Sequence, residues 1–307
     1  MKSVICTLFE GHYEIGLAAF LNSLVKTDFL GEVVAGYRGA LPPWASPSTK
    51  QGRFHQFKLS SNITVQFLEL ETKAHFTNFK PDFMLDIWEH HFPGAEAMFY
   101  FDPDITIKCN WHFFEKWVRA GIALCQDVNG NLSENHPLRH AWKEYFSKAG
   151  VELNVPRTAY FNAGFVGLEK KNAAFLETWR NIQDLAWPAI GGAERWDIHD
   201  RTFMFNRTDQ DFLNAATMAT TLPISWIGKD GMDLEPGGFI MSHSLGSPKP
   251  WKKKMLWQAL SKGVFPSGPE KQFFSNVHAP LAPLPSFQLF LKKLDLTAAS
   301  VLGRYLG

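Results

Sequence analysis

The segment that decides the fold is Ala97-Met98-Phe99-Tyr100-Phe101-Asp102-Pro103-Asp104, in which five apolar residues lead directly into two carboxylates. An apolar run of this length predicts a strand that is buried on both faces of a sheet. The carboxylates then lie at the end of that strand, with His243, Gly246 and Lys249 available far downstream. Two carboxylates, an imidazole and an ammonium suit a divalent cation that carries a diphosphate. The segment therefore indicates an enzyme that acts on a nucleotide-activated substrate.

Strand-like and helix-like patterns alternate on both sides of this segment. In the first half the predicted strands span residues 3–8, 32–36, 63–70 and 97–101, and the predicted helices span 13–25 and 81–91. In the second half the predicted strands span 121–126 and 159–168, and the predicted helices span 138–148, 172–185 and 210–219. The Pro- and Ser-rich segment 41–52 predicts a loop. Such alternation predicts an α/β fold with a mostly parallel sheet flanked by helices, in which ligands gather at the carboxyl ends of the strands.

Composition narrows the class of protein. With 307 residues, 45% of them hydrophobic and 20% charged, the chain can bury a large core, which predicts a catalytic domain with an appendage or two small lobes. Its net charge of +1 lacks the basic excess of a nucleic-acid-binding protein. Cys6, Cys109 and Cys125 form no Cys-x-x-Cys pair, which argues against a disulfide framework or a zinc site. These cysteines, and first residues that lack the apolar core of a signal peptide, predict a cytoplasmic protein.

Two later segments carry further polar residues. The segment His243-Ser244-Leu245-Gly246-Ser247-Pro248-Lys249-Pro250-Trp251 places an imidazole, a glycine that allows close backbone approach and a phosphate-binding lysine in one short loop. Residues 187–207 are longer than an ordinary connection, so we interpret them as a lid on the acceptor side. An Asp-Pro-Asp turn is common by itself, because Asp and Pro both favour turns. The loop at 243–251 is what favours a metal site.

Four motifs in a fixed order carry a family resemblance. They are Phe101-Asp102-Pro103-Asp104, Phe161-Asn162-Ala163-Gly164-Phe165, Asp209-Gln210-Asp211-Phe212-Leu213-Asn214 and His243-x-x-Gly246-x-x-Lys249-Pro250-Trp251. In this order the chain resembles the family 8 glycosyltransferases of the GT-A fold, the group that contains lipopolysaccharide galactosyltransferases and glycogenin. The segment from Thr7 to Leu24 is similar to that family's nucleotide-binding opening. The resemblance covers residues 1 to about 255.

The resemblance implies a role for each motif. Asp102, Asp104 and His243 would bind Mn²⁺ or Mg²⁺, which bridges the phosphates of a UDP-sugar. Gly246 and Lys249 would contact the phosphates, and Thr7, Glu10 and Tyr13 would contact the nucleotide. Asn162, Ala163, Gly164 and Asp209 would contact the sugar, and Gln210 would face the anomeric carbon. Glu10 stands where the family has an Asp-rich or Asn-containing turn, and Lys80 replaces its basic donor-binding residue.

The implied reaction moves a hexose, from UDP-Gal or UDP-Glc, to a glycan, glycolipid or glycoprotein acceptor with retention of anomeric configuration. Attack by the acceptor on the face from which the phosphate departs is a leading proposal for this family. Gln210 could then only position or stabilise, because an amide is a poor nucleophile. The resemblance also divides the chain into a GT-A catalytic domain at 1–255, with a nucleotide-sugar half at 1–127 and an acceptor half at 128–255, and a C-terminal tail at 256–307.

Two other classes of protein compete with this interpretation. Phe101-Asp102-Pro103-Asp104-Ile105-Thr106 also satisfies the Asp-x-Asp-x-Thr motif of haloacid-dehalogenase-type phosphatases, in which Asp102 would be the nucleophile and Asp104 the general acid. That motif normally opens its domain, whereas here a βαβ-like unit precedes it, and Gly228-Lys229-Asp230-Gly231-Met232-Asp233 has the wrong spacing to complete the phosphatase metal site. A non-catalytic sugar-binding protein would not need the Asp pair and the phosphate loop together.

The C-terminal tail has a composition of its own. Lys252, Lys253 and Lys254 precede a stretch in which basic residues are interleaved with aromatic residues and leucines up to Arg304. Such a segment suits the surface of an anionic membrane, which predicts peripheral membrane contact. A terminal helix packed on the catalytic core is the alternative, and the sequence leaves both open.

Overall fold

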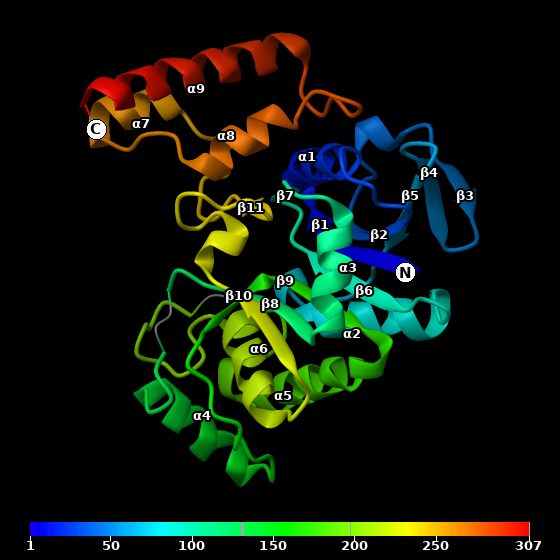
Figure 1. Ribbon diagram of the computed structural model, residues 1–307, viewed down its shortest axis with the longest axis vertical. Coiled ribbons are helices and arrows are strands. Elements are labelled where there is room, and N and C mark those ends of the chain that lie inside the picture. The colour runs from blue at the N-terminus through cyan, green and yellow to red at the C-terminus, as the bar shows by residue number, and fades with distance from the viewer. Residues whose placement is uncertain (130–131, 197, 307) are drawn as a thin grey trace.

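A large central sheet organises the part of the chain that the computed structural model describes, residues 1–129, 132–196 and 198–306 (Figure 1). Its strands are β1 (Ser3–Glu10), β2 (Gly31–Arg38), β3 (Thr49–Gln51), β4 (Phe54–Lys58), β5 (Ile63–Glu69), β6 (Ala97–Phe101), β8 (Ile122–Gln126), β9 (Phe161–Glu169) and β10 (Ile224–Ile227). Within these residues the strand order is β10-β8-β9-β6-β1-β2-β5-β4-β3. The pairs β1–β2, β1–β6, β2–β5 and β8–β10 are parallel, whereas β9 and the β3–β4 hairpin are antiparallel to their neighbours. The predicted mixed, mostly parallel sheet is confirmed.

The strand β6 lies inside the sheet, and all five of its residues are buried. Met98 and Tyr100 pack into the core on one side of the sheet, while Ala97, Phe99 and Phe101 pack into the core on the other side. Successive side chains of a strand point to opposite faces, so a strand that is covered on both faces must be apolar at every position. The uninterrupted apolar run before Asp102 therefore has a structural cause.

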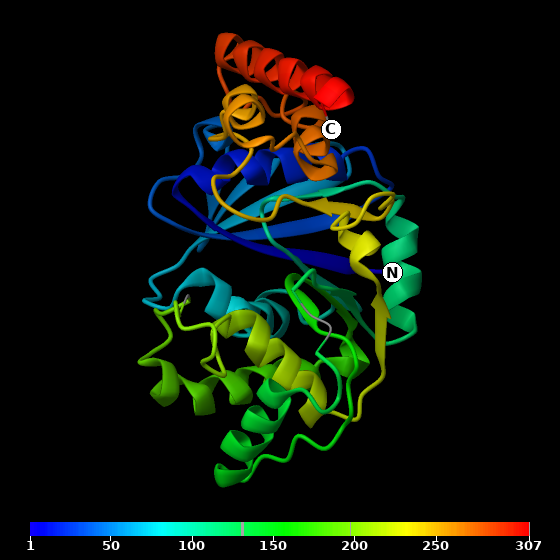
Figure 2. The ribbon, with the colours of Figure 1, turned by 90° about the vertical axis from the view of Figure 1, so that its left-hand side faces the viewer.

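Helices cover both faces of the sheet (Figure 2). One face packs against α1 (Glu14–Leu24) and α3 (Trp111–Arg119). The other packs against α2 (Lys80–Asp86), α4 (Pro137–Lys148), α5 (Ala174–Ile190) and α6 (Thr208–Ala219). The helix predicted at 81–91 is α2 followed by a π-helical turn at Ile87–His91. The predicted helical flanks of the sheet are thus confirmed.

The alternating pattern did not predict α3, β4, β10 or the shortest strands. The segment 41–52, which the sequence predicts as a loop, contains β3, and the three residues of β3 are exposed. Two other strands, β7 (Ile105–Ile107) and β11 (Met241–His243), form a separate antiparallel ribbon. Strands of three residues carry too little periodicity to be recognised, because a period of two needs several residues to be visible.

Three C-terminal helices form a layer over α1 (Figure 1). They are α7 (Met255–Lys262), α8 (Gly268–Ser275) and α9 (Ser286–Leu306). Their small core is made by Ala19, Trp251, Met255, Ala259, Phe273, Phe274, Val277, Leu284 and Ala299. The carboxylate of Asp295 in α9 accepts the backbone N–H groups of Met255 and Leu256 at 2.7 and 2.9 Å, so α9 caps the start of α7. Among the described residues, no helix is both long and apolar enough to cross a bilayer.

Asn22 of α1 fastens the segment that leads into α9. Its amide nitrogen donates to the carbonyls of Asn276 and Leu281 at 2.7 and 2.8 Å, and its Oδ1 accepts the N–H of Leu281 at 2.8 Å. The side chain is fully buried, so no water reaches these backbone groups. The C-terminal layer is thereby joined to the sheet by hydrogen bonds as well as by apolar packing.

We expect Asn22→Ala to lower the free energy of unfolding by about 3 kcal/mol, because three buried backbone groups lose their partner. Denaturant-induced unfolding followed by circular dichroism measures the change. Asn62→Ala is the matched control, because Asn62 is exposed, and its effect should stay within about 0.5 kcal/mol. A loss below about 1 kcal/mol for Asn22→Ala would contradict the role of Asn22 as a clamp.

Candidate functional site

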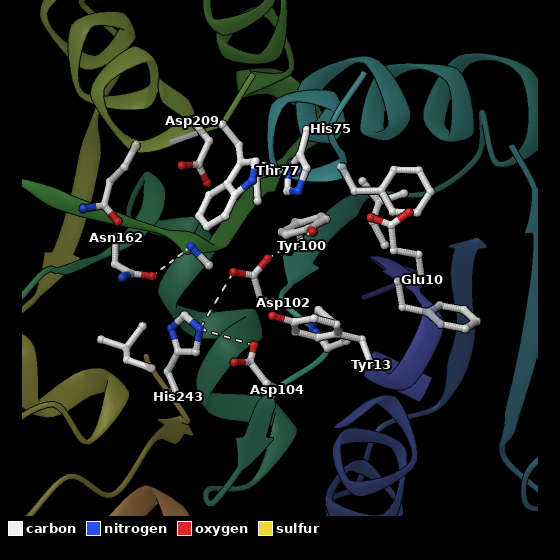
Figure 3. A pocket seen from close by; sticks show the side chains of 18 of the residues that line it. Glu10, Tyr13, His75, Thr77, Tyr100, Asp102, Asp104, Asn162, Asp209 and His243 are labelled. Carbon is white, nitrogen blue, oxygen red and sulfur yellow. Dashed lines mark hydrogen bonds and ion pairs between the residues drawn. The ribbon is translucent and has the colours of Figure 1, made fainter. Parts of the chain in front are cut away.

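A cavity of about 300 Å³ lies at the carboxyl end of β6 (Figure 3). Its walls come from the ends of β1 and β6, the segment before α2, the start of β9, the first turn of α6 and the loop after β11. Open α/β sheets bind their ligands at this end of the strands. The Asp102-Pro103-Asp104 turn is part of the wall, as the apolar strand before it predicts.

The β7–β11 ribbon brings two distant segments to this cavity. Within it His243 pairs with Ile105, the residue after Asp104. The N–H of Ser244 also donates to the carbonyl of Asp104 at 3.1 Å. On the other side, the N–H of Ile107 donates to Oγ of Ser23 in α1 at 2.8 Å, which holds the ribbon against the helix. The imidazole and the carboxylates therefore meet through backbone pairing.

Asp102, Asp104 and His243 form a compact cluster (Figure 3). Nε2 of His243 lies 3.4 Å from Oδ1 of Asp104 and 3.8 Å from Oδ2 of Asp102. One ligand atom from each of the three residues falls within 4.8 Å of the others. Asp104 and His243 are each only 4% exposed, while Asp102 is partly open to the cavity. Two carboxylate oxygens and one imidazole nitrogen are a donor set that can bind a divalent metal.

Gly164 lets this cluster close. A Cβ at this position would lie 2.5 Å from Cε1 of His243 and 2.9 Å from Oδ2 of Asp102. Both distances are shorter than carbon atoms tolerate, so any side chain would push the imidazole or the carboxylate away. The carbonyl of Gly164 also accepts the N–H of Asp102 at 2.8 Å. The glycine of the Asn162-Ala163-Gly164 motif is therefore explained by close approach to Asp102 and His243.

Lys249 neutralises Asp104. Its Nζ lies 2.5 Å from Oδ2 of Asp104 and 3.0 Å from the carbonyl of Ser244. Burial alone would raise the pKa of Asp104, but the charges of Lys249 and His243 outweigh it and hold that pKa well below its usual range. Burial would likewise lower the pKa of Lys249, and Asp104 reverses the effect and raises it. The pair is therefore ionised at neutral pH.

Lys80 neutralises the other carboxylates. Its Nζ lies 3.2 Å from Asp102 and 3.1 Å from Asp209, and it donates to the carbonyl of Ala163 at 2.9 Å. Burial would lower the pKa of Lys80, which is 1% exposed, but Asp102 and Asp209 raise it above its usual value. These three oxygens match the three donors of an ammonium group. Lys80 therefore ties the turn at Asp102 to the start of α6.

The amide of Asn162 is held in a single orientation. Its Nδ2 donates to Oδ2 of Asp127 at 2.6 Å, and its Oδ1 accepts the N–H of Gly164 at 2.8 Å. Asp127 itself is buried and follows directly after β8. The end of β8 thus sets which face of Asn162 the cavity meets.

The first turn of α6 supplies the opposite wall. Asp209 and Gln210 line the cavity, and Oε1 of Gln210 accepts the N–H of Ala163 at 3.4 Å. Behind them, Asp211 accepts the hydroxyl of Tyr160 at 2.6 Å and the N–H of Arg207 at 2.8 Å. Burial raises the pKa of Asp211 to about 7, although both hydrogen bonds oppose it. The orientation of α6 therefore depends on an acid that can be protonated at neutral pH.

Glu10 and Tyr13 lie at the end of the cavity away from α6, and the centre of the Tyr13 ring is 5.8 Å from Nζ of Lys249, beside the Asp102–Asp104–His243 cluster (Figure 3). Glu10 forms an ion pair with Arg38, whose Nη2 lies 2.9 Å from Oε2. Arg38 also donates to the carbonyls of Thr72 and Ala74, so it connects β2 with the segment before α2. Burial raises the pKa of the Tyr13 phenol, which keeps it neutral. This end offers an aromatic ring beside a carboxylate of fixed orientation.

Most residues singled out from the sequence do meet in one place. Those that line the cavity are Glu10, Tyr13, Asp102, Asp104, Asn162, Gly164, Asp209, Gln210, His243 and Lys249. Thr7, Lys80 and Ala163 are buried outside its lining, and Gly246 is exposed in the loop after β11. Sequence reasoning missed Arg38, His75 and Asp127, and it included Trp196 only as part of the predicted lid at 187–207. Arg38 and Asp127 stand where parallel strands end, a signal that could have found them.

Comparison with known proteins identifies the class of fold. No protein-family model matches the chain, and no curated protein matches its sequence. A solved structure of WbbM, a bifunctional glycosyltransferase in its apo form, is similar over 95% of this chain with a TM-score of 0.54 and 12% identity. The match covers 51% of WbbM, so this chain spans about half the length of that protein. The chain therefore has a glycosyltransferase fold.

The raised pKa of Asp211 makes stability depend on pH. The folded protein keeps a proton on Asp211 up to about pH 7, whereas the unfolded chain releases it near pH 4. Its contribution to stability is present below about pH 4 and is lost as the pH rises towards 7. We expect Asp211→Asn to reduce the decline in unfolding free energy over this range by about 1 kcal/mol per pH unit. Denaturant titrations at several pH values measure it, with exposed Glu134→Gln as the control, and parallel declines in both variants would contradict the assignment.

Proposed function

We propose that this protein is a metal-dependent, retaining glycosyltransferase of the family 8 type. In this proposal it moves a hexose from a nucleotide-sugar, UDP-Gal or UDP-Glc, to a saccharide, glycolipid or glycoprotein acceptor. The observation that carries the proposal is the Asp102–Asp104–His243 cluster in a cavity at the carboxyl end of β6, within a glycosyltransferase fold. WbbM, which shares the fold, is itself described as a glycosyltransferase.

The proposed metal ligands are Asp102, Asp104 and His243, and they fit Mn²⁺ or Mg²⁺. Nδ1 of His243 is buried without a hydrogen-bond partner among the described atoms, so the ring is held by packing and its Nε2 faces the carboxylates. When bound, the cation would neutralise the charge that develops on a departing diphosphate. Lys249 lies beside the same cluster and supplies a second positive charge there.

The two ends of the cavity suit the two ends of a nucleotide-sugar. Tyr13 and Glu10 would meet the base and ribose, with Thr7 supporting them from β1 and Gly246 leaving room for the phosphates. Asn162, Ala163, Gly164 and Asp209 would surround the sugar, and Lys80 would hold Asp209 in place for its hydroxyls. Gln210 would face the anomeric carbon and stabilise it. In this proposal residues 1–127 form the nucleotide-sugar half and residues 128–255 the acceptor half, and the donor's sugar lies between the halves, against residues of the second.

The phosphatase alternative meets an electrostatic obstacle. It needs Asp104 as a general acid, which must carry a proton near neutral pH. Burial favours that proton, but Lys249 and His243 outweigh burial and keep the pKa of Asp104 well below its usual range. Asp104 is therefore a carboxylate, which suits a ligand and does not suit a proton donor.

The outer face of the C-terminal helices, within the proposed tail at 256–307, supports a membrane-borne acceptor. Exposed apolar side chains gather on α7, α9 and the turn between α7 and α8; they are Trp257, Leu260, Val264, Phe287, Phe290, Leu291, Leu294, Val301 and Tyr305. Lys262 and Lys293 belong to the same helices. Apolar side chains interleaved with lysines suit an anionic lipid surface. We infer peripheral contact of this face with a membrane.

Metal and donor binding are tested with two substitutions. Asp104→Asn removes one charge of the cluster at nearly constant volume, so we expect it to abolish Mn²⁺-dependent binding of UDP in isothermal titration calorimetry. Lys249→Met should raise the affinity for Mn²⁺ when UDP is absent. Its ammonium competes with a cation for Asp104, so the variant should bind Mn²⁺ without UDP about tenfold more tightly than the wild type.

Lys252→Met controls for charge, because Lys252 is an exposed lysine of the same segment. It should leave the affinity for Mn²⁺ within about twofold. Unchanged UDP binding by Asp104→Asn would remove the metal site from the proposal. Equal Mn²⁺ affinities for Lys249→Met and Lys252→Met would contradict the claim that Lys249 competes with the cation for Asp104.

Membrane contact is tested on the intact chain. Phe287→Ser combined with Phe290→Ser should lower sedimentation with phosphatidylglycerol vesicles at least about fivefold, because each exposed aromatic ring contributes apolar area to the bound state. Leu30→Ser is the control, since Leu30 is equally exposed but lies before β2, outside the C-terminal helices. Failure of the wild-type protein to sediment with these vesicles would contradict membrane contact, and a soluble acceptor would then be the better proposal.

A further inference from the structure

Trp196 combines exposure with a position on the cavity wall. It is 53% exposed, although tryptophan is usually buried for its large apolar area, and it lines the cavity together with His75 and Asp209. Its indole stacks on the ring of His75, with 5.2 Å between the ring centroids and 19° between the planes. The two rings form a flat aromatic pair at the mouth of the cavity, on the side of Asp209.

Hydrogen bonds from the side chains of Asn78 and Thr208 hold the backbone around Trp196. The amide nitrogen of Asn78 donates to the carbonyls of Ala193 and Arg195 at 2.9 and 2.7 Å, and Oδ1 of Asn78 accepts the hydroxyl of Thr208 at 2.9 Å. The same hydroxyl lies 3.2 Å from the carbonyl oxygen of Trp196, so its one proton is shared between the two acceptors. Asn78 and Thr208 are both buried, so these bonds persist without competition from water. The indole is therefore presented by a fixed support.

His75 is neutral and has one defined tautomer. Burial lowers its pKa. Its Nδ1 lies 2.8 Å from Oγ1 of Thr77 and 3.4 Å from the N–H of Thr77, and because an N–H can only donate, Nδ1 is the acceptor. The proton of the neutral ring then sits on Nε2. A neutral ring stacked under an indole adds apolar area and one N–H donor without adding charge. This combination suits an uncharged ligand that has an apolar face and hydroxyl groups.

We propose that Trp196 and His75 form the platform on which the acceptor's terminal sugar ring stacks. A pyranose presents C–H groups on one face and hydroxyls around its edge, which an aromatic plane and an N–H donor match. The inference rests on the proposed glycosyltransferase function, in which the nucleotide occupies the end at Glu10 and Tyr13. The platform runs from Trp196, which Thr208 holds beside the first turn of α6, to His75, on which the charge of Glu10 acts. Trp196 is open to solvent, so a second substrate reaches it while the donor is bound.

Saturation-transfer difference NMR tests the platform with methyl β-galactoside and methyl β-glucoside as probes, in the presence of UDP and Mn²⁺. We expect signals at the ring C–H protons with the wild-type chain, a loss of at least about fivefold for Trp196→Ala and partial recovery for Trp196→Phe. Trp226→Ala is the matched control, because Trp226 is 48% exposed and lies on β10 outside the cavity. It should leave the signals unchanged. Melting temperatures of the variants establish that each is folded.

Each alternative result has a defined meaning. Equal signals for Trp196→Ala and the wild type, or no signal for either probe with the wild type, would overturn the platform. If Trp196→Ala lost calorimetric UDP binding to the same extent as the sugar signals, the indole would serve the donor, and this result would also overturn the platform. A wild-type chain that binds the sugars but not Mn²⁺ with UDP would instead refute the proposed function and leave a sugar-binding protein.

Discussion

Burial of charge at the end of β6 is the constraint on which the site depends. Asp104 is 4% exposed, and an unpaired carboxylate at such a position would cost several kcal/mol. Its compensation comes from Lys249 and His243, and that of Asp102 comes largely from Lys80. These partners arrive from the loop after β11, from β11 itself and from the start of α2. Neutralising two neighbouring carboxylates thus brings together three distant parts of the chain, namely residue 80, residues 102–104 and residues 243–249.

Packing around Gly16 adds a second link between these parts. A Cβ on Gly16 would lie 2.8 Å from the carbonyl oxygen of Pro103 and 2.9 Å from Cη2 of Trp251. Trp251 also donates from Nε1 to Nδ1 of His12 at 2.9 Å and belongs to the core of the C-terminal helices. The Glu10–Tyr13 end of the cavity, the Asp-Pro-Asp turn and the C-terminal layer therefore share one contact. Through it, a change in the C-terminal helices can reach the cavity.

Much of the fold follows from local pattern, because long buried strands and amphipathic helices repeat over many residues. The apolar run 97–101 became β6, and the helices predicted at 138–148 and 210–219 became α4 and α6 almost to the residue. The pattern predicted a loop at 41–52, where β3 lies, and it was silent on α3, β4, β10 and the β7–β11 ribbon. Three-residue strands are defined by their partner, so their own sequence cannot reveal them.

The candidate site divides in the same way. Asp102, Asn162 and Gln210 could be found because each belongs to a recognisable motif, whereas Trp196 belongs to none. The sequence also pointed to Lys80 and Lys249, but it did not show which carboxylates they pair with. In the structure Lys80 bridges Asp102 and Asp209, and Lys249 pairs with Asp104. Ion pairs act through space and their partners lie far apart along the chain, so local pattern carries no record of them.

By itself, then, the sequence determined which residues are apolar, where most of the longer strands and helices run and which groups can bind a cation. Only the tertiary structure decided that His243 pairs beside Ile105 and that Gly164 lies where a side chain would strike the imidazole. It also decided that Trp196 stacks on His75 at the mouth of the cavity. The physical reason is that hydrophobic burial depends on each residue's own chemistry, whereas a site depends on distances between residues that only the folded chain brings together.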